Sequence, residues 1–216
     1  MTTVEPERVL IPAGPYLCGP DEEGLNIPRF LKAQVSAESE VSAFAVARAP
    51  VTNAQYAAFV VAAGHEPPRH WDGPTPPGML VDHPVVHVSW HDAMAYAAWA
   101  RARLLTLEEW EKAARGTDGR RFPWGDWSEG RCNSRAAGVG TTTPVGSYSP
   151  AGDSPYGCVD MAGHVQEWTR SASEKYRVLR GGAFNHREEI LQTFYAARHV
   201  PTYHHENIGF RIGWDV

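Results

Sequence analysis

The string R-V-L-R-G-G, residues 177–182, and the string N-I-G-F-R, residues 207–211, frame the C-terminal segment of this 216-residue chain. Gly181 and Gly182 allow the backbone to adopt positive φ values and to pass close to other groups. Between the two strings lie four of the ten histidines, at positions 186, 199, 204 and 205. This segment therefore carries the residues best suited to chemistry.

The composition is that of a globular chain without a strong charge imbalance. Hydrophobic residues make up 43% of the chain, enough for a sizeable core, and the formal net charge is −5. Neither a Lys/Arg cluster nor an apolar run of roughly 20 residues is present, so we expect no nucleic-acid or membrane partner. Residues 1–7 lack the regions of a signal peptide, which predicts a cytoplasmic protein. Three widely spaced cysteines predict free thiols.

The 20 Gly, 17 Pro and 8 Trp residues favour short elements joined by ordered loops. We expect a single domain over residues 1–216, of unknown oligomeric state. The apolar pattern predicts a strand and turn at 9–16, a loop at 20–40, a strand at 42–47, and a strand at 83–90 that runs into a helix cap.

Three helices are predicted from capping-box spacing, in which a Ser or Thr is followed three residues later by a polar side chain. These N-caps are Thr52, Ser89 and Thr106. The apolar period that follows predicts helices over 53–63, from 89 to about 102, and over 107–115. Gly64 and Gly116 are suited to end the first and the third.

Seven strings resemble one known family in order and spacing. They are H-P-V-V-x-V-S-W (83–90), R-L-x-T-x-x-E-W-E-K-A-A-R-G (103–116), F-P-W-G-D (122–126), T-P-V-G-S-Y (143–148), Y-G-C-x-D-M-A-G (156–163), E-W-T (167–169) and G-F-R (209–211). They resemble the formylglycine-generating enzymes, or sulfatase-modifying-factor domains, whose relatives include the iron-dependent sulfoxide synthases of ergothioneine biosynthesis. The resemblance implies an irregular α+β fold of the C-type-lectin kind, with little regular secondary structure, a few short helices and small antiparallel sheets.

The segment after Gly182 departs from the family pattern. Formylglycine-generating enzymes bind copper through two cysteine thiolates that follow the Gly-Gly turn, and soft thiolates suit Cu(I). Here the first of these places falls at His186, and the second falls at Ile190 or Leu191, depending on where a one-residue gap is put. We therefore do not expect this chain to convert cysteine to formylglycine.

Two further positions, His164 and His87, carry histidine where the family usually has asparagine. Imidazoles together with a carboxylate and an open coordination position suffice for a catalytic metal. We expect His164 and His186 to share a cavity and to hold iron or copper, with His87 as a further ligand. The alternative is that a backbone carbonyl satisfies each histidine, because no short ligand motif joins them.

The resemblance also implies structural calcium, which requires oxygen ligands. Glu167, with the backbone oxygens of Gly163 and Val165, fits one such site. Asn133 begins a second site, but the usual acidic partner downstream of it is missing. The alternative for Glu167 is a buried carboxylate paired with an arginine such as Arg211.

Several side chains near the histidines are candidates for contact with a small-molecule ligand, because aromatic rings suit flat or cationic groups. These candidates are Gln166, Phe184, Tyr195, Tyr203 and Trp71. Arg198 matches an arginine of the family and is expected to hold a substrate carboxylate, the alternative being an internal salt bridge.

Two classes of function remain. The first is a metal-dependent oxidase or oxygenase that acts on a small molecule, with His164, His186 and Arg198 as catalytic residues. The second is a non-catalytic ligand- or protein-binding module of the C-type-lectin kind, like the variable proteins of diversity-generating retroelements. Those systems diversify asparagine codons, from which Glu188 and Glu189 are not expected. This observation favours the enzyme.

Overall fold

The computed structural model describes residues 5–20 and 37–216 of the chain. Its helices and strands are short and are joined by long ordered loops. In chain order they are β1 (Arg8–Ile11), β2 (Gly14–Cys18), β3 (Ala37–Val41), β4 (Phe44–Ala47), α1 (Asn53–Ala63), η2 (Gly78–Leu80), α2 (Trp90–Trp99), β5 (Arg103–Leu104), α3 (Leu107–Arg115), η3 (Arg135–Ala137), β6 (Gln166–Ser173), β7 (Tyr176–Arg180), η4 (Glu188–Ile190), β8 (Ala196–His199), β9 (Ile208–Phe210) and β10 (Ile212–Asp215).

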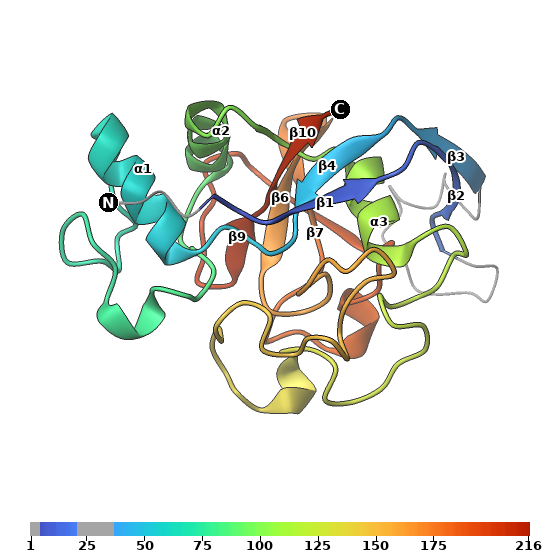
Figure 1. Ribbon diagram of the computed structural model, residues 1–216. Helices are drawn as coiled ribbons and strands as arrows, with labels where there is room; N and C mark the ends of the chain where they lie inside the picture. The colour runs from blue at the N-terminus through green and yellow to red at the C-terminus, as the bar shows by residue number, and fades with distance from the viewer. Residues whose placement is uncertain (1–4, 21–36) are drawn as a thin grey trace.

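Within the described residues, the strands form two four-stranded sheets, ordered β1-β4-β10-β5 and β8-β7-β6-β9, and a small β2-β3 pair. The pairs are antiparallel as expected, except that β6 and β9 run parallel, with Gln166 opposite Ile208. Figure 1 shows α1 and α2 on one side of the central strands and α3 on the other. The irregular segment between α3 and β6 forms the lower part of that view.

The three predicted helices are present, and each begins with the predicted capping box, at Thr52, Ser89 and Thr106. The bounds of α1 and α3 agree with the prediction. The second helix ends at Trp99, earlier than predicted. It ends there because Arg101 has a left-handed φ of 51° and the N–H of Ala102 donates to the Ala97 carbonyl instead of continuing the helix.

The prediction of a strand at 83–90 is wrong. This segment makes only an isolated bridge, between Pro84 and Thr52, and its backbone donors go to separate loops. The Val85 N–H donates to Val51, while the His87 N–H donates to His205. In the loop predicted at 20–40, residues 37–40 belong to β3 instead, and residues 21–36 lie outside the described residues.

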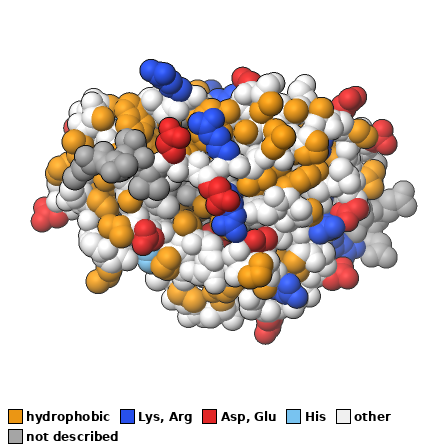
Figure 2. Space-filling model, viewed as in Figure 1, with side chains coloured by type: hydrophobic (Ala, Val, Ile, Leu, Met, Phe, Trp, Pro, Cys, Tyr) orange, Lys and Arg blue, Asp and Glu red, His pale blue; other side chains and the backbone are white. Residues whose placement is uncertain are grey.

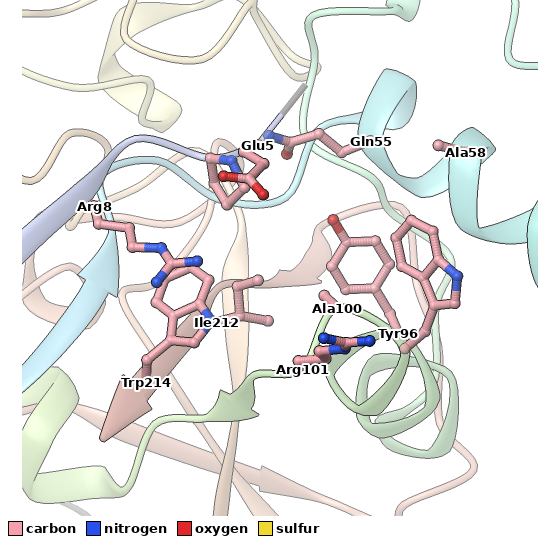
Figure 3. A pocket seen from close by; sticks show the side chains of 11 residues that line it. Glu5, Arg8, Gln55, Ala58, Tyr96, Ala100, Arg101, Ile212 and Trp214 are labelled. Atoms are coloured by element: carbon pink, nitrogen blue, oxygen red, sulfur yellow. The ribbon is translucent and has the colours of Figure 1, made fainter. Parts of the chain in front are cut away.

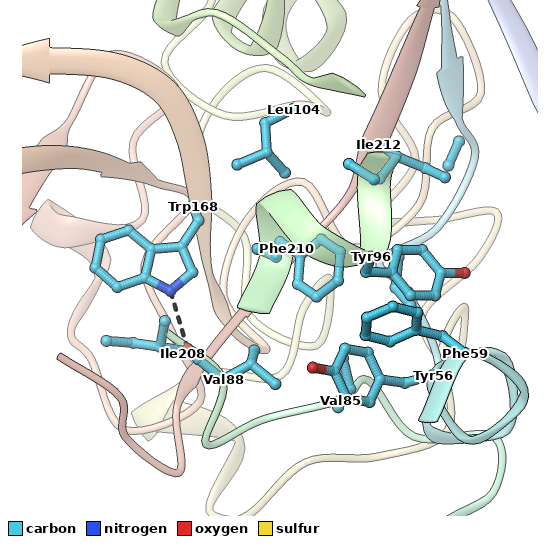
Figure 4. Packing of buried hydrophobic residues seen from close by; sticks show 14 of the residues in the cluster. Tyr56, Phe59, Val85, Val88, Tyr96, Leu104, Trp168, Ile208, Phe210 and Ile212 are labelled. Carbon is cyan, nitrogen blue, oxygen red and sulfur yellow. Dashed lines mark hydrogen bonds between the residues drawn. The ribbon is translucent and has the colours of Figure 1, made fainter. Parts of the chain in front are cut away.

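The largest hydrophobic cluster joins α1 and α2 to the strands β5, β6, β9 and β10. In Figure 4 the rings of Tyr56, Phe59 and Tyr96 lie together at one end of this cluster, and Trp168 lies at the other. The Trp168 indole N–H donates to the Val88 carbonyl over 3.0 Å, so its buried polar atom is paired. Each such buried ring stabilises the fold by roughly 1.5–3 kcal/mol, which allows short elements to hold together.

A buried ion pair joins the two large sheets. The Glu167 carboxylate accepts hydrogen bonds from Nε and Nη2 of Arg211, both at 2.7 Å, and from the Trp110 indole at 2.6 Å. Both Glu167 and Arg211 are almost fully buried. The alternative interpretation of Glu167, a carboxylate paired with Arg211, is confirmed.

The surface and the thiols agree with a globular chain. On the face shown in Figure 2, Lys and Arg side chains lie beside Asp and Glu side chains instead of forming a block. None of the helices in the described part of the chain has the length and apolar character that a membrane span requires. Cys18, Cys132 and Cys158 are buried free thiols, as predicted.

Replacing Glu167 by Gln should destabilise the fold by about 3–5 kcal/mol, because the buried Arg211 charge would lose its partner. Urea unfolding followed by circular dichroism measures the change. The control is Asp118→Asn, which removes the partly exposed pair with Arg120 and should cost about 0–1 kcal/mol. Equal effects of the two substitutions would contradict a structural role for the buried pair.

Candidate functional site

Three loops meet where β9 begins. The His87 N–H donates to the His205 carbonyl over 3.0 Å, and a ring nitrogen of His205 lies 2.9 Å from Asn207 Oδ1. Asn207 Nδ2 in turn donates to Asn185 Oδ1 over 3.0 Å. The Gln166 N–H donates to the Asn207 carbonyl at 2.8 Å, which fixes the loop against β6. The segment before α2 is thereby tied to the loop after the Gly-Gly turn.

The Gly-Gly turn requires glycine at both positions. Gly181 and Gly182 have φ values of 90° and 66°. A Cβ at Gly182 would lie 2.5 Å from Leu191 Cδ2 and 2.9 Å from the Ile190 carbonyl oxygen, closer than atoms can pack. The close backbone approach predicted from the sequence is confirmed.

A cavity of about 370 Å³ opens beside this meeting point. We call it the histidine cavity. It is lined by Tyr56, Glu66, Pro67, Pro68, Arg69, His87, Val88, Ser89, Asp92, Thr202 and His204. The His87 ring lies between two other imidazoles, with its centroid 4.8 Å from that of His70 and 6.4 Å from that of His204. Histidines far apart in the sequence therefore converge at one wall.

Two of these histidines, His70 and His87, are held neutral. Burial lowers the pKa of His70 to about 4, and the neighbouring His87 contributes to the shift. Burial also lowers the pKa of His87, assisted by His204. Neutral imidazole offers one donor and one acceptor, so these rings can bind polar groups of either kind.

Asp92 supplies a fixed negative charge at the cavity. Burial opposes this charge, but hydrogen bonds from Ser89 and from the His65 ring outweigh it and lower the pKa of Asp92. The His65 ring nitrogen lies 2.9 Å from the carboxylate. Asp92 is therefore already engaged by the cap of α2 and by His65.

Several buried polar atoms around the histidine cavity have no hydrogen-bond partner among the described residues. They are both ring nitrogens of His70, Nδ1 of His204 and the indole nitrogen of Trp71. Buried polar groups are normally paired, so each unpaired group needs an explanation. Of these three residues, His204 lines the histidine cavity.

His186 lies in a different cavity, of about 320 Å³, which we call the His186 cavity. It is lined by Trp127, Glu129, Ser134, Arg135, Ala136, His186, Arg187, Glu188 and Glu189. Burial lowers the pKa of His186, and its Nδ1 has no hydrogen-bond partner among the described residues. His186 stands where the family has its first copper-binding cysteine. It lies outside the histidine cavity.

His164 lines neither cavity. It is fully buried, and its left-handed φ of 64° directs the ring toward Thr143, whose backbone N–H and carbonyl lie 3.2 and 3.0 Å from Nε2. Its Nδ1 lies 3.4 Å from the Asp160 carboxylate. In the described part of the chain, no group of three or more His, Cys, Asp or Glu side chains is placed to hold a metal ion. His164 and His186 therefore do not share the expected cavity, and with His87 they form no such group.

Two of the predicted calcium ligands, Glu167 and Asn133, make other contacts. The Glu167 oxygens are taken by Arg211 and Trp110. The Gly163 turn packs against Asn133, whose carbonyl oxygen would lie 2.3 Å from a Cβ at that glycine. The Asn133 amide donates to the Thr141 carbonyl over 2.8 Å.

One of the predicted oxygen ligands beside Gly163 is unpaired within the described part of the chain. The Val165 side chain is buried, and Asn133 Oδ1 has no hydrogen-bond partner among the described residues. Glu167 offers no free oxygen there, because it is neutralised by Arg211. At Glu167 the structure shows an ion pair with Arg211.

The predicted substrate contacts are dispersed. Phe184 and Gln166 are buried, and Tyr195 is half-buried. Trp71 is buried beside the histidine cavity, with its ring centroid 6.2 Å from that of His70. Tyr203 stacks on His199 with centroids 4.1 Å apart, in the loop that supplies Thr202 and His204 to the cavity.

Arg198 lies on the exposed side of β8. Its guanidinium carbon is 5.3 Å from the centre of the Tyr176 ring, and its Nη1 donates to Ser173 Oγ over 3.4 Å. It lines neither the histidine cavity nor the His186 cavity. The expectation that Arg198 holds a substrate carboxylate is therefore not supported by its position.

The sequence analysis missed Glu66, Arg69 and His70, which belong to the Pro-rich loop before η2. Their spacing carries no motif, and their roles depend on a loop that folds back over α1 and α2. One available signal was that Arg69 and His70 directly precede Trp71, a candidate for ligand contact.

Comparison with known proteins identifies the family. Residues 1–216 match the family of sulfatase-modifying factor enzyme 1-like domains. The chain belongs to this family. A hercynine oxygenase of Mycolicibacterium smegmatis is 33% identical over 264 residues, covering 96% of this chain and 61% of that protein. A formylglycine-generating enzyme of Streptomyces coelicolor is 32% identical, covering 97% of this chain and 89% of that enzyme.

The fold comparison agrees. The solved structure of PvdO from Pseudomonas aeruginosa has a TM-score of 0.81 to this chain at 23% identity, and the match covers 98% of this chain and 95% of PvdO. The predicted formylglycine-generating-enzyme fold is confirmed. The chain spans only 61% of the length of the Mycolicibacterium relative, so that protein has further residues outside the match.

The neutral histidines predict that acid destabilises the fold. Because burial lowers the pKa of His70 from 6.5 to about 4, the unfolded chain binds more protons than the folded chain between these values. His70 therefore contributes stability in full above pH 6.5, and this contribution is lost as the pH falls toward 4. Since His70 is only half-buried, we expect a loss of roughly 1–2 kcal/mol.

Urea unfolding near neutral pH and near the folded pKa of His70 measures this loss. A His70→Gln variant keeps a polar side chain that does not titrate, and it should lose less stability on acidification than the unsubstituted protein. Equal acid losses in both proteins would contradict the assignment to His70.

Proposed function

We propose that this chain is the substrate-binding domain of an oxygenase of its family and that its small-molecule substrate binds in the histidine cavity. The observation that carries the proposal is the gathering of Arg69, His87 and His204 around a cavity of about 370 Å³ where three loops meet. This size is within the range of small-molecule sites, roughly 300–1,000 Å³. The relatives named hercynine oxygenase support the class of reaction.

The charges of the cavity favour a zwitterionic substrate. The Arg69 guanidinium offers parallel donors that suit a carboxylate. Glu66, on the same loop, can pair with a cationic group, whereas Asp92 is already engaged by His65. The neutral ring of His87 can then orient the substrate through a single hydrogen bond.

The expected transition metal does not fit the described residues. Iron or copper would supply the activation of dioxygen in an oxygenase of this kind. The ring centroids of His70 and His87 are 4.8 Å apart, so two imidazoles lie near each other. In the described part of the chain, no third metal ligand joins them. We therefore derive no step through a metal, and the role proposed for this domain is to bind and orient the substrate.

The same structure argues against conversion of cysteine to formylglycine. All three cysteines of the chain lie outside the segment that follows the Gly-Gly turn. Burial raises the pKa of each thiol, to about 12 for Cys132, so the reactive thiolate is disfavoured. No pair of thiolates is available for Cu(I) in the family's manner.

Isothermal titration with hercynine tests the proposal. The unsubstituted protein should bind hercynine at one saturable site. Arg69→Gln should weaken binding at least about tenfold, because a hydrogen bond to a charged group contributes roughly 1.5–3 kcal/mol. His87→Asn should also weaken it, while the backbone stays intact, since asparagine tolerates the left-handed φ of 60° at this position.

His186→Asn is the matched control. It replaces a half-buried histidine of the His186 cavity, and it should leave hercynine binding unchanged. Loss of binding in His186→Asn, with none in the two histidine-cavity variants, would contradict the location of the site. No binding by the unsubstituted protein would reject hercynine as its substrate.

A further inference from the structure

A third cavity, of about 290 Å³, lies between β1, the end of α2 and β10. We call it the arginine slot. Figure 3 shows Trp214, overlain by Arg8, on one side of the slot and Tyr96 on the other, with Ile212 between them. Arg101 lies below Ile212 in this view. The slot thus combines an apolar interior with two cationic side chains.

The arginine slot is separate from the histidine cavity. Tyr56 lines the histidine cavity, and Tyr96 lines the slot. Their buried rings stack on each other, with centroids 5.7 Å apart and an interplanar angle of 16°. The linings of the two cavities have no residue in common, so the slot is a distinct site.

Arg8 is held ready for an anion. Its guanidinium carbon lies 4.1 Å from the centre of the Trp214 ring. Such stacking fixes the plane of the guanidinium while its in-plane N–H donors remain available for a carboxylate. By contrast, Arg103 and Arg211 donate to the carboxylates of Glu109 and Glu167. In the described part of the chain, Arg8 forms no ion pair.

Arg101 occupies a conformation that favours glycine. It follows the last residue of α2 and the C-cap Ala100, and its φ is 51°. Helices commonly place glycine at this left-handed position, because a side chain there is strained. Strained residues cluster at functional sites. Arg101 also has no carboxylate partner among the described residues, and its side chain lines the slot.

The charges of the lining decide the ligand class. Arg8 and Arg101 contribute two positive charges and Glu5 one negative charge, which leaves one net positive charge in the slot. The partly exposed rings of Trp99 and Trp214 offer an apolar surface. Flat aromatic groups pack well against such rings.

We propose that the arginine slot binds a small aromatic carboxylate, with its carboxylate attracted by Arg8 and Arg101 and its ring against Trp99. This binding site is independent of the proposed oxygenase function. The stacked rings of Tyr56 and Tyr96 join the lining of the histidine cavity to that of the slot.

Titration with 4-hydroxybenzoate tests the proposal, and its uncharged methyl ester is the matched probe. The acid should bind saturably, and the ester should bind at least about tenfold more weakly, since it cannot form charged hydrogen bonds with the arginines. Arg8→Gln and Arg101→Gly should each weaken binding of the acid by at least about tenfold. The exposed Arg187, which lines the His186 cavity, gives the control variant Arg187→Gln, which should bind like the unsubstituted protein.

Arg101→Gly separates binding from folding. Glycine relieves the strain at the left-handed position, so this variant should unfold at a temperature no lower than that of the unsubstituted protein. Loss of acid binding together with retained stability would support the proposal. Equal binding of acid and ester, unchanged binding in both arginine variants, or no binding of the acid would overturn it.

Discussion

The structure depends on the buried ion pair between Glu167 and Arg211. Arg211 lies between β9 and β10, which belong to different sheets, while Glu167 lies in β6. Arg211 also donates to the carbonyl oxygens of Ala47, Arg48 and Val159, so its donors are paired with several segments. A buried charge is tolerated only when it is neutralised and hydrogen-bonded. Arg211 meets both conditions, and it lies where the chain passes from one sheet to the other.

This constraint reaches the histidine cavity through neighbouring residues. Gln166 precedes Glu167, and its N–H binds the Asn207 carbonyl at the entry to β9. Asn207 then contacts His205 and Asn185, and the His205 carbonyl accepts a hydrogen bond from His87. The loops that form the cavity are therefore fixed by hydrogen bonds to the strands that the ion pair holds in register.

Much of the fold could be predicted from local sequence. The capping boxes at Thr52, Ser89 and Thr106 depend on residues three positions apart, and all three are present. The end of α2 could not be predicted, because Arg101 adopts a conformation that its residue type disfavours. The prediction of a strand before α2 was wrong because the backbone donors of this segment pair with distant loops. No local sequence pattern shows such pairing.

The site was harder to predict than the fold. Substitutions in family motifs identified His87 and His186, but the sequence cannot show that a left-handed turn directs His164 toward Thr143. It also cannot show that the Pro-rich loop brings His70 within 4.8 Å of His87, as measured between ring centroids. These features follow from tertiary packing, in which short loops lie on the helices and strands of the core.

The central claim is that the substrate binds in the histidine cavity and not in the His186 cavity. The most direct measurement is nuclear magnetic resonance of the protein with ¹⁵N-labelled histidine rings during titration with hercynine. The account predicts that the ring signals of His87 and His204 shift in a saturable way while that of His186 stays in place. A saturable shift of the His186 signal, with His87 and His204 unchanged, would contradict it.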